Sequence, residues 1–229
     1  MPDGLRAAAA LVYSSDLDAP QLSAEDSHHL SRVLRLGEGE TVAVSDGDGA
    51  FRLFAVARGS RGGDLVLEAR GEVQVAERAG EVAVGFALVK HDRSEWAVAK
   101  LVELGVSRIT PLVCERGVVR PEGGRREERL ERIARESAMQ SRRVFLPVLD
   151  PPRRFGEVAA ELAAVGGAAL AEPGGPPLAG GVSTVLVGPE GGWTDGELGC
   201  GLPLVGLGDT VLRTETAAVA AAVLLLHHR

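Results

Sequence analysis

The stretch TVLVGPEGGWTDGEL, residues 184–198, joins an apolar, β-branched run to a polar segment through a glycine-rich turn. The apolar run predicts a buried strand, and Thr194 predicts the N-cap of the helix that follows. The turn lacks the Lys-Ser/Thr pair of a phosphate loop and the Gly-x-Gly-x-x-Gly of a dinucleotide fold. Ligands of open parallel sheets bind at the carboxyl ends of strands, which is where Gly188 stands. The turn therefore predicts either a ligand site of another kind or a tight loop that binds nothing.

Two features of the C-terminal region favour a ligand. Gly191 and Gly192 have no Cβ atom, so the backbone there can approach a flat molecule closely. A second turn, LGDTVLRTETA at 207–217, opens the last helix, with Thr214 or Thr216 as its expected cap. Two such turns would surround one pocket with backbone amides and carbonyls, an arrangement that suits adenine better than phosphate.

From residue 81 onward, apolar runs that predict strands alternate with segments of helical periodicity. Strands are expected within 81–89, 108–113, 168–172 and 183–188, an extended segment at 143–150, and helices within 92–106, 125–140, 154–167 and 214–228. Gly105 is expected to end the first helix. This alternation predicts an α/β domain with a mostly parallel sheet and helices on both of its faces.

The first 72 residues have the pattern of a small β-rich unit. Ser23 predicts the cap of a short helix with Leu30, Val33 and Leu34 on one face. ETVAVSDGDGAFRLFAVA, at 40–57, predicts a hairpin, and one more strand follows it. We expect a domain at 1–72, a linker at 73–80 and a second domain at 81–229.

Composition excludes several classes of protein. The chain has 229 residues, of which 45% are hydrophobic, and only two cysteines, which predict neither a disulfide framework nor a metal site. The apolar runs at 7–12 and 217–226 are too short for a secretory core and a membrane span, respectively. We expect a cytoplasmic protein that binds no metal and no membrane.

Charge is distributed unevenly along the chain. The net charge is −7, yet residues 116–154 hold eleven arginines against six acidic residues. A local basic stripe on an acidic body is compatible with RNA binding. For 125–136 alone, a solvated amphipathic helix with i,i+4 ion pairs is the favoured alternative.

Four stretches together closely resemble one family. VGPEGGWTDGEL and LGDTVLRTETAAVAAAVLL resemble the C-terminal signature of the RsmE family of 16S rRNA uridine N3-methyltransferases, within the SPOUT superfamily of knotted methyltransferases. HHLSRVLRLGEGE resembles the N-terminal segment of the family, and KHDRSEWAVAKLVELGVSRITPLVCERGVV resembles the start of its catalytic domain. SAMQSRRVFLPVL is a weaker match, in which Met139 replaces a glutamate and Arg142 a glycine. The matches span about residues 28 to 226.

The resemblance implies an N-terminal PUA-like β-barrel followed by a SPOUT α/β domain with a C-terminal deep trefoil knot. It implies that the cofactor S-adenosylmethionine binds in the knot. The residues expected to bind it are Leu170, Val187, Gly188, Gly191, Gly192, Leu207, Gly208 and Leu212. The implied partner is 16S rRNA or the small ribosomal subunit. Candidate RNA-binding residues are Arg32 and Arg35, which are expected to share a helix face, together with Arg116, Gln140 and Arg143.

The chemistry of N3 methylation indicates two candidate catalytic residues. Neither cysteine lies in a motif that would activate the nucleophile that C5 methylation commonly needs. Methylation of N3 requires loss of a weakly acidic proton and in-line placement of the methyl group. Arg213 is the candidate for stabilising the uracil anion, although it could instead pair with a carboxylate at the helix start. Glu190 could take the proton, but a structural role in the loop is the favoured alternative.

Two other functions are compatible with the sequence. The chain could be an RNA-binding protein without catalysis, or a nucleotide-binding α/β enzyme that acts on a small molecule. Intact glycines in GPEGG argue against the first, and the basic segment at 116–154 argues against the second.

The helix at 214–228 is apolar nearly all round, which predicts cover on two sides and hence a C2 homodimer. Arg143 or Arg120 could complete the site of the partner chain.

Overall fold

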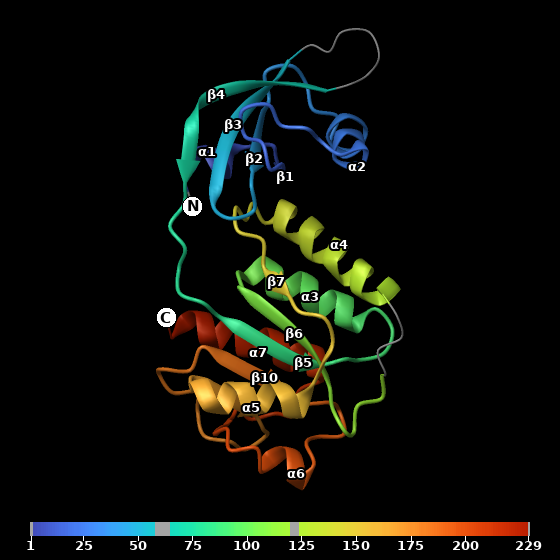
Figure 1. Cartoon of the computed structure of the whole chain (residues 1–229), viewed down its shortest axis with the longest axis vertical. Helices are drawn as coiled ribbons and strands as arrows, with labels where there is room; N and C mark the ends of the chain where they lie inside the picture. Colours follow the sequence, from blue (N-terminus) through green and yellow to red (C-terminus); the bar gives the residue numbers. More distant parts are fainter. Residues whose placement is uncertain (1, 58–64, 120–123, 229) are drawn as a thin grey trace. The chain divides into compact units, whose positions relative to one another are not determined.

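The computed structural model describes residues 2–57, 65–119 and 124–228. The chain forms two compact units, and Figure 1 shows their elements. One unit comprises Met1–Ala79 with Ala138–Leu146, and the other comprises Gly80–Ser137 with Pro147–Arg229. The segment Ala138–Leu146, which the sequence pattern assigns to the second domain, therefore belongs to the N-terminal unit. Arg120 lies outside the described residues.

A seven-stranded sheet forms the centre of the second unit, and its pairings are all parallel. Its strands are β5 (Ala83–Ala87), β6 (Arg108–Val113), β7 (Val148–Leu149), β8 (Arg153–Arg154), β9 (Ala168–Ala171), β10 (Thr184–Val187) and β11 (Leu204–Val205). The strand order is β11-β9-β10-β5-β6-β7, and β8 also pairs with β6. The predicted parallel sheet is confirmed.

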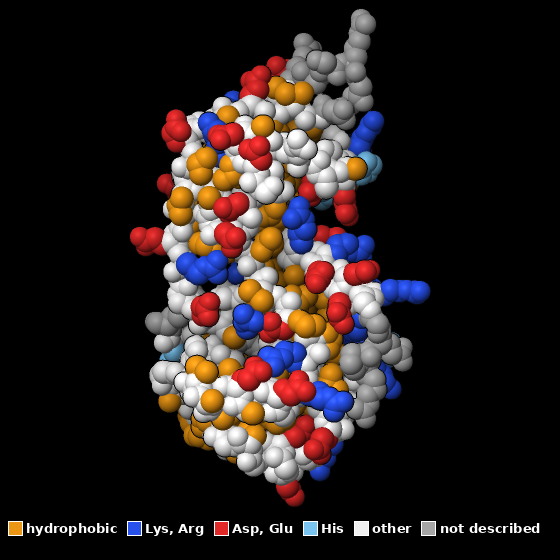
Figure 2. Space-filling model, in the orientation of Figure 1, with side chains coloured by type: hydrophobic (Ala, Val, Ile, Leu, Met, Phe, Trp, Pro, Cys, Tyr) orange, Lys and Arg blue, Asp and Glu red, His pale blue; other side chains and the backbone are white. Residues whose placement is uncertain are grey.

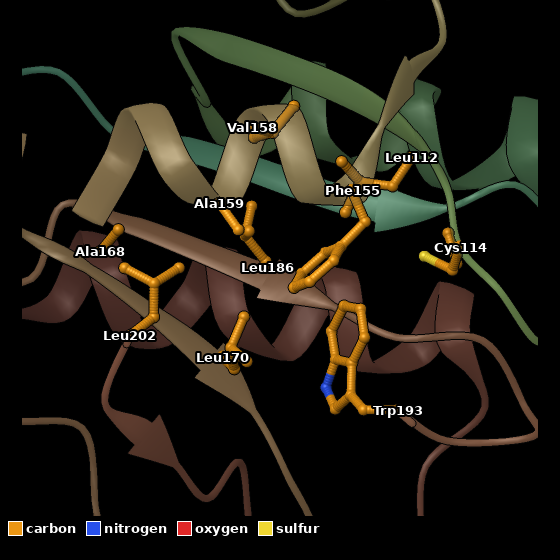
Figure 3. Close-up of a cluster of buried hydrophobic side chains, with 11 residues drawn as sticks. Leu112, Cys114, Phe155, Val158, Ala159, Ala168, Leu170, Leu186, Trp193 and Leu202 are labelled. Carbon is orange, nitrogen blue, oxygen red and sulfur yellow. The ribbon is translucent and has the colours of Figure 1, made fainter. Parts of the chain in front are cut away.

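Helices cover both faces of this sheet, as the alternating pattern predicts. They are α3 (Arg93–Leu104), α4 (Gly124–Gln140), α5 (Phe155–Val165), α6 (Asp195–Leu198) and α7 (Thr214–His227). Helix α7 packs against α3, β5 and β10. Figure 3 shows α5 on the opposite side of the strands, with Val158 and Ala159 directed toward them. Gly105 ends α3 with a φ of 104°, so its predicted role as C-cap is confirmed.

The core between α5 and the sheet determines where the glycine turn lies. Phe155, at the start of α5, and Trp193, in the turn after β10, stack with their ring centroids 4.7 Å apart. Both are buried with Leu170 and Leu186 of the neighbouring strands (Figure 3). Aromatic pairs of this kind contribute about 1 kcal/mol beyond the burial of their area. Trp193 therefore anchors the turn to the core.

The N-terminal unit contains a four-stranded sheet in the order β1-β2-β3-β4. Its elements are α1 (Asp3–Ala7), β1 (Ala10–Tyr13), α2 (Ala24–His28), the π-helical turn η1 (His29–Val33), β2 (Thr41–Ser45), β3 (Ala50–Ala57) and β4 (Val66–Val75). Strands β2 and β3 form the predicted hairpin, and Ser23 accepts from the amide of Asp26 as the predicted cap. Residues 73–75, expected in the linker, are part of β4.

The predicted apolar face of the first helix is only partly correct. Leu30 is fully buried, but Val33 is 60% exposed and Leu34 is 40% exposed. The reason is a change of helix type, because α2 passes into a π-helical turn that ends at Val33. Arg35 lies beyond that turn with a φ of 53°, so the expectation that it shares a helix face with Arg32 is wrong.

Segment Ala138–Leu146 packs into the β2–β3 turn of the same unit. Leu146 donates its amide to the carbonyl of Gly47 at 2.8 Å, and Gly49 donates its amide to Val144 at 3.1 Å. A Cβ atom at Gly49 would lie 2.4 Å from the ring of Phe145. Glycine is therefore needed in this turn, because segment Ala138–Leu146 occupies the space that a side chain would take.

Arg142 stands where the resemblance described above predicts glycine. Its φ of 56° lies in the left-handed region that favours glycine. Its guanidinium donates to the carbonyls of Ala8 at 3.3 Å, Ala9 at 2.6 Å and Met139 at 3.1 Å. These bonds offset the backbone strain, and burial lowers the pKa of the guanidinium.

Candidate functional site

A pocket in the second unit opens at the carboxyl ends of β9, β10 and β11. This is where an open parallel sheet is expected to bind a ligand. Its walls come from the segments that follow these three strands and from the start of α7. The lining residues are Ala171, Glu172, Pro173, Val187, Gly188, Pro189, Glu190, Gly192, Trp193, Leu207, Gly208, Thr210, Val211, Leu212, Thr214 and Ala217.

Two glycines leave open space in the pocket wall. Gly192 has a φ of 70° and Gly208 a φ of 139°, and at both positions a Cβ atom would meet nothing within 4 Å. Both residues line the pocket. Gly188 differs, because a Cβ atom there would lie 2.9 Å from the indole of Trp193. The first two glycines therefore place no side chain in the pocket wall, whereas Gly188 allows the indole to pack.

The two turns that form the pocket are joined by a direct hydrogen bond. The hydroxyl of Thr214 donates to the carbonyl of Gly188 at 2.9 Å. The expectation that Thr214 or Thr216 caps α7 is therefore wrong: the N-cap is Arg213, which makes no side-chain cap. The indole nitrogen of Trp193 donates to the carbonyl of Ala171 at 3.0 Å, which links the turn after β10 to the end of β9.

Residues that follow β6 hold the glycine turn from outside the pocket. Arg116 donates to the carbonyls of Gly191 at 3.2 Å and Trp193 at 3.0 Å. Glu197 accepts from the amides of Glu115 and Thr194, and completes a capping box with Thr194 at the start of α6. The predicted cap at Thr194 is confirmed. Arg116, expected at an RNA surface, thus contacts the turn itself.

The structure brings most of the expected cofactor residues together. Six of the eight line the pocket, namely Val187, Gly188, Gly192, Leu207, Gly208 and Leu212. Leu170 is fully buried beneath it, and Gly191 faces Arg116, whose Cβ lies 3.3 Å from the position of an added Cβ. Sequence reasoning missed Glu172, although it follows a predicted strand end in the same way as Gly188 does.

The charged side chains that line the pocket are both carboxylates. Glu172 and Glu190 line it, and no lysine or arginine does so in the described part of the chain. Glu190 pairs with Arg93, the first residue of α3, at 2.5 Å. Arg213 is exposed between two lining residues, Leu212 and Thr214, and none of the described carboxylates forms an ion pair with it.

Neither cysteine lines the pocket, although Cys114 lies close to the glycine turn in the core. Burial, with a smaller contribution from Glu197, raises the pKa of the Cys114 thiol to about 12. A thiol of this kind is protonated at neutral pH and is a poor nucleophile. Within residues 2–57, 65–119 and 124–228, no cluster of three metal-binding side chains occurs, and no helix is long and apolar enough to cross a membrane.

Four of the five expected RNA-binding residues belong to the N-terminal unit. Arg32 and Arg35 are exposed, and Gln140 is exposed at the end of α4. The backbone carbonyl of Arg143 accepts from the hydroxyl of Tyr13 at 2.5 Å.

The arginine-rich helix α4 bears mixed charges. Arg129 pairs with Glu95 at 2.7 Å, and Arg132 lies 3.8 Å from Glu136 in an i,i+4 pair. Figure 2 likewise shows basic and acidic side chains interspersed over the visible face. This pairing agrees with the solvated amphipathic helix that was the alternative interpretation of 125–136.

Comparisons with known proteins give matches over most of the chain. Residues 76–226 match the family model of the RNA methyltransferase domain, and residues 22–63 match that of the RNA methyltransferase PUA domain. The chain is 32% identical to the ribosomal RNA small subunit methyltransferase E of Synechocystis sp., over 87% of this chain and 70% of that protein. It is 33% identical to the Mycobacterium bovis protein of the same name, over 86% of this chain and 82% of that protein.

A solved structure is similar along nearly its whole length. It is the ribosomal RNA small subunit methyltransferase E of Neisseria gonorrhoeae bound to S-adenosyl methionine. The TM-score is 0.81 at 25% identity, and the match covers 95% of this chain and 97% of that one.

Proposed function

Because this chain belongs to the RsmE family of ribosomal RNA small subunit methyltransferases, we propose that it transfers a methyl group from S-adenosylmethionine to N3 of a uridine in 16S rRNA. The observation that carries the proposal is the pocket at the ends of β9, β10 and β11. It combines two open glycine positions with apolar walls and two carboxylates, in a family with a member that binds this cofactor.

The residues present fit S-adenosylmethionine better than a nucleotide phosphate. The backbone at Gly192 and Gly208 can lie against a flat adenine, and Leu207, Val211 and Leu212 supply apolar contacts. Glu172 favours a ligand with positive charge, which the cofactor carries on its sulfonium and amino groups, whereas the charge of Glu190 is already compensated by Arg93. A triphosphate would face two carboxylates with no lysine or arginine among the described lining residues. The charge of the pocket therefore argues against the small-molecule nucleotide enzyme.

Arg213 is the catalytic residue that we propose for the uracil. The bound cofactor supplies an electrophilic methyl group, and N3 must lose its proton before it can form the new C–N bond. Negative charge then spreads to O2 and O4, where an unpaired guanidinium stabilises it. Arg213 is exposed beside Leu212, at the edge of the pocket. N3 lies on the pairing edge of uracil, so the base must be unpaired or turned out of its stack.

Glu190 fits the role of proton acceptor less well than a structural role. Its carboxylate pairs with Arg93, and taking up a proton would break this pair. We propose that Glu190 orders the loop, and that the proton leaves through water.

The proposed reaction is tested by incubating 16S rRNA with the protein and methyl-labelled cofactor, then identifying the modified nucleoside by mass spectrometry. The expected product is 3-methyluridine. Arg213→Ala should lower kcat by about 100-fold or more, as the loss of one charge-stabilising donor does, with cofactor affinity unchanged. A label on C5 of uracil, or no label in RNA, would contradict the proposal.

We assign RNA binding to the N-terminal unit and propose that its sheet is part of a PUA-like barrel. We also propose that the pocket loops belong to a deep trefoil knot. In support, the chain passes from β10 to β11 on the far side of β9 and then returns to α7 beside β5 and β10. Since ribosomal RNA is the substrate, we place the protein in the cytoplasm.

We propose further that two chains form a homodimer through α7. One stripe of this helix is only partly covered in the described part of the chain: Val219 and Ala220 are half-buried, and Val223 is 47% exposed. Small and apolar residues there allow close approach of a second helix. Light scattering should give about twice the chain mass of 23.8 kDa, and Val223→Glu should give monomers. A fully active wild-type monomer would contradict the dimer.

A further inference from the structure

Three charged side chains from three separate elements meet behind the glycine turn. Arg93 begins α3, Glu190 lies in the turn after β10, and Glu215 lies in the first turn of α7. The guanidinium of Arg93 lies 2.5 Å from one carboxylate oxygen of Glu190 and 3.6 Å from one of Glu215. Of the three, only Glu190 lines the pocket.

Glu215 is the most buried member of this group. Its side chain is only 10% exposed, and its second oxygen, Oε2, is buried with no hydrogen-bond partner among the described residues. A carboxylate in this position depends on the one cation beside it, because an uncompensated buried charge is strongly destabilising. Glu215 therefore holds Arg93 in place from the α7 side.

Arg93 is also fixed by its first carboxylate partner. The hydrogen bond to Glu190 raises the pKa of the Arg93 guanidinium against the opposing effect of burial, and Glu215 adds a smaller contribution. The side chain of Arg93 is 26% exposed and that of Glu190 is 49% exposed, so this bridge is partly open to solvent. The link from Arg93 to Glu215, whose side chain is 10% exposed, is the more shielded of the two and is screened less by salt.

The bridge joins two elements that a side-chain hydrogen bond already connects. The hydroxyl of Thr214 ties the first residue of α7 to Gly188, and Arg93 ties the second residue of α7 to Glu190. Two consecutive residues of α7 thus fasten two positions of the glycine turn. Of these two links, the one through Arg93 orients the side chain of Glu190, which lines the pocket.

We propose that Arg93 is a positioning residue for cofactor binding: held by Glu215, it fixes the carboxylate of Glu190 at the wall of the pocket. The inference rests on the proposed cofactor site. It divides the role of Arg93 into two parts that can be measured separately. Its pairing with Glu215 supports the fold, and its pairing with Glu190 supports the affinity for S-adenosylmethionine.

The test compares Arg93→Met, Glu190→Gln and Glu215→Gln, with the double variants Arg93→Met/Glu190→Gln and Arg93→Met/Glu215→Gln. Arg93→Met should lower the melting temperature by roughly 5 °C or more, since it leaves Glu215 unpaired, and Glu215→Gln should restore most of that loss. Arg93→Met and Glu190→Gln should each weaken S-adenosylmethionine binding about tenfold, and their double variant should be no weaker than either alone.

The matched control is Lys100→Met, which removes the ion pair to Glu103 on the same α3 helix, where both side chains are about 40% exposed, and should change neither quantity. Additive losses of affinity in Arg93→Met/Glu190→Gln would overturn the proposal, as would recovery of affinity when Glu215→Gln restores stability. Failure of the proposed function would differ from both, because the wild-type protein would then not bind S-adenosylmethionine while the stability effects remained.

Discussion

Two glycine-rich turns in this molecule are both built from small and acidic residues. They differ in whether another part of the chain fills the side-chain positions of their glycines. In the β2–β3 turn, Asp46–Gly49, side-chain positions at Gly47 and Gly49 are filled by Leu146 and Phe145. In the turn after β10, the side-chain position at Gly192 is open, and the residue lines the pocket. Both turns contain glycines with positive φ, so the backbone alone does not distinguish them.

The difference shows how a glycine motif should be interpreted. Where the chain itself fills the missing side chain, glycine serves packing, and substitution should cost stability. Where nothing fills it and the glycine lines the pocket, we expect glycine to serve a ligand, and substitution should cost affinity. Each of the following predictions tests one side of this contrast.

The largest effect is expected at Gly49. Alanine there would place Cβ 2.4 Å from the ring of Phe145, in addition to the strain of a φ of 110°. We expect Gly49→Ala to lose about 3 kcal/mol or more of stability in urea unfolding. Gly39 is the matched control, because its φ is 86° and nothing lies within 4 Å of an added Cβ. Gly39→Ala should lose only about 1 kcal/mol from strain, and equal losses at both sites would refute the packing interpretation.

Gly192 should show the opposite behaviour. Its φ is 70° and an added Cβ would enter free space, so Gly192→Ala should keep the fold with about 1 kcal/mol of strain. The methyl group would occupy space intended for the cofactor, and we expect affinity for S-adenosylmethionine to fall about tenfold or more. Gly201, with a φ of 89°, open space and no place in the pocket, is the control. An equal affinity in Gly192→Ala and Gly201→Ala would remove Gly192 from the site.

The same contrast, between residues that serve the fold and residues that are free to bind a ligand, applies to the arginines of the N-terminal unit. Arg142 directs its donors to carbonyls of its own unit, whereas Arg32 and Arg35 are exposed. We expect Arg32→Ala/Arg35→Ala to reduce the log–log salt slope of RNA binding by about two units, one per lost phosphate contact, with cofactor affinity unchanged. Arg52, already paired with Asp18 at 2.7 Å, is the control. An unchanged slope in the double variant would place the RNA on another surface.

The smallest effect concerns Cys114, which is buried in the core cluster that contains Trp193. Burial raises the pKa of this thiol from 9.0 to about 12, so the folded state keeps its proton after the unfolded state has lost it. Stability from this group is therefore complete below pH 9.0 and is lost as the pH rises toward 12. By pH 10 the loss should reach about 1 kcal/mol, and it should be absent from Cys114→Ala. Identical pH profiles of unfolding for the two proteins would contradict it.

Local patterns were sufficient to predict much of the fold and part of the site. Most strands and helices of the second unit, the Gly105 and Thr194 caps and the β2–β3 hairpin depend on short-range periodicity and turn chemistry, whereas β8 and β11 were not predicted. Gly192 could be named from the glycine-rich turn after a predicted strand, whereas Gly208 was named from the family resemblance.

Long-range packing accounts for what sequence reasoning missed. The bridge from Arg93 to Glu190 joins residues 97 positions apart, and the bond from Arg142 to Ala9 joins residues 133 apart. No local pattern indicates such pairs. The same holds for Ala138–Leu146, whose place in the N-terminal unit follows from the space left by Gly47 and Gly49.

The central claim is that the open space at Gly192 and Gly208 belongs to S-adenosylmethionine. A calorimetric titration of the wild-type protein with S-adenosylmethionine, and separately with ATP, tests it most directly. We predict saturable binding of one S-adenosylmethionine per chain and no measurable heat of binding with ATP. Tighter binding of ATP, or no binding of S-adenosylmethionine to the folded protein, would contradict the claim.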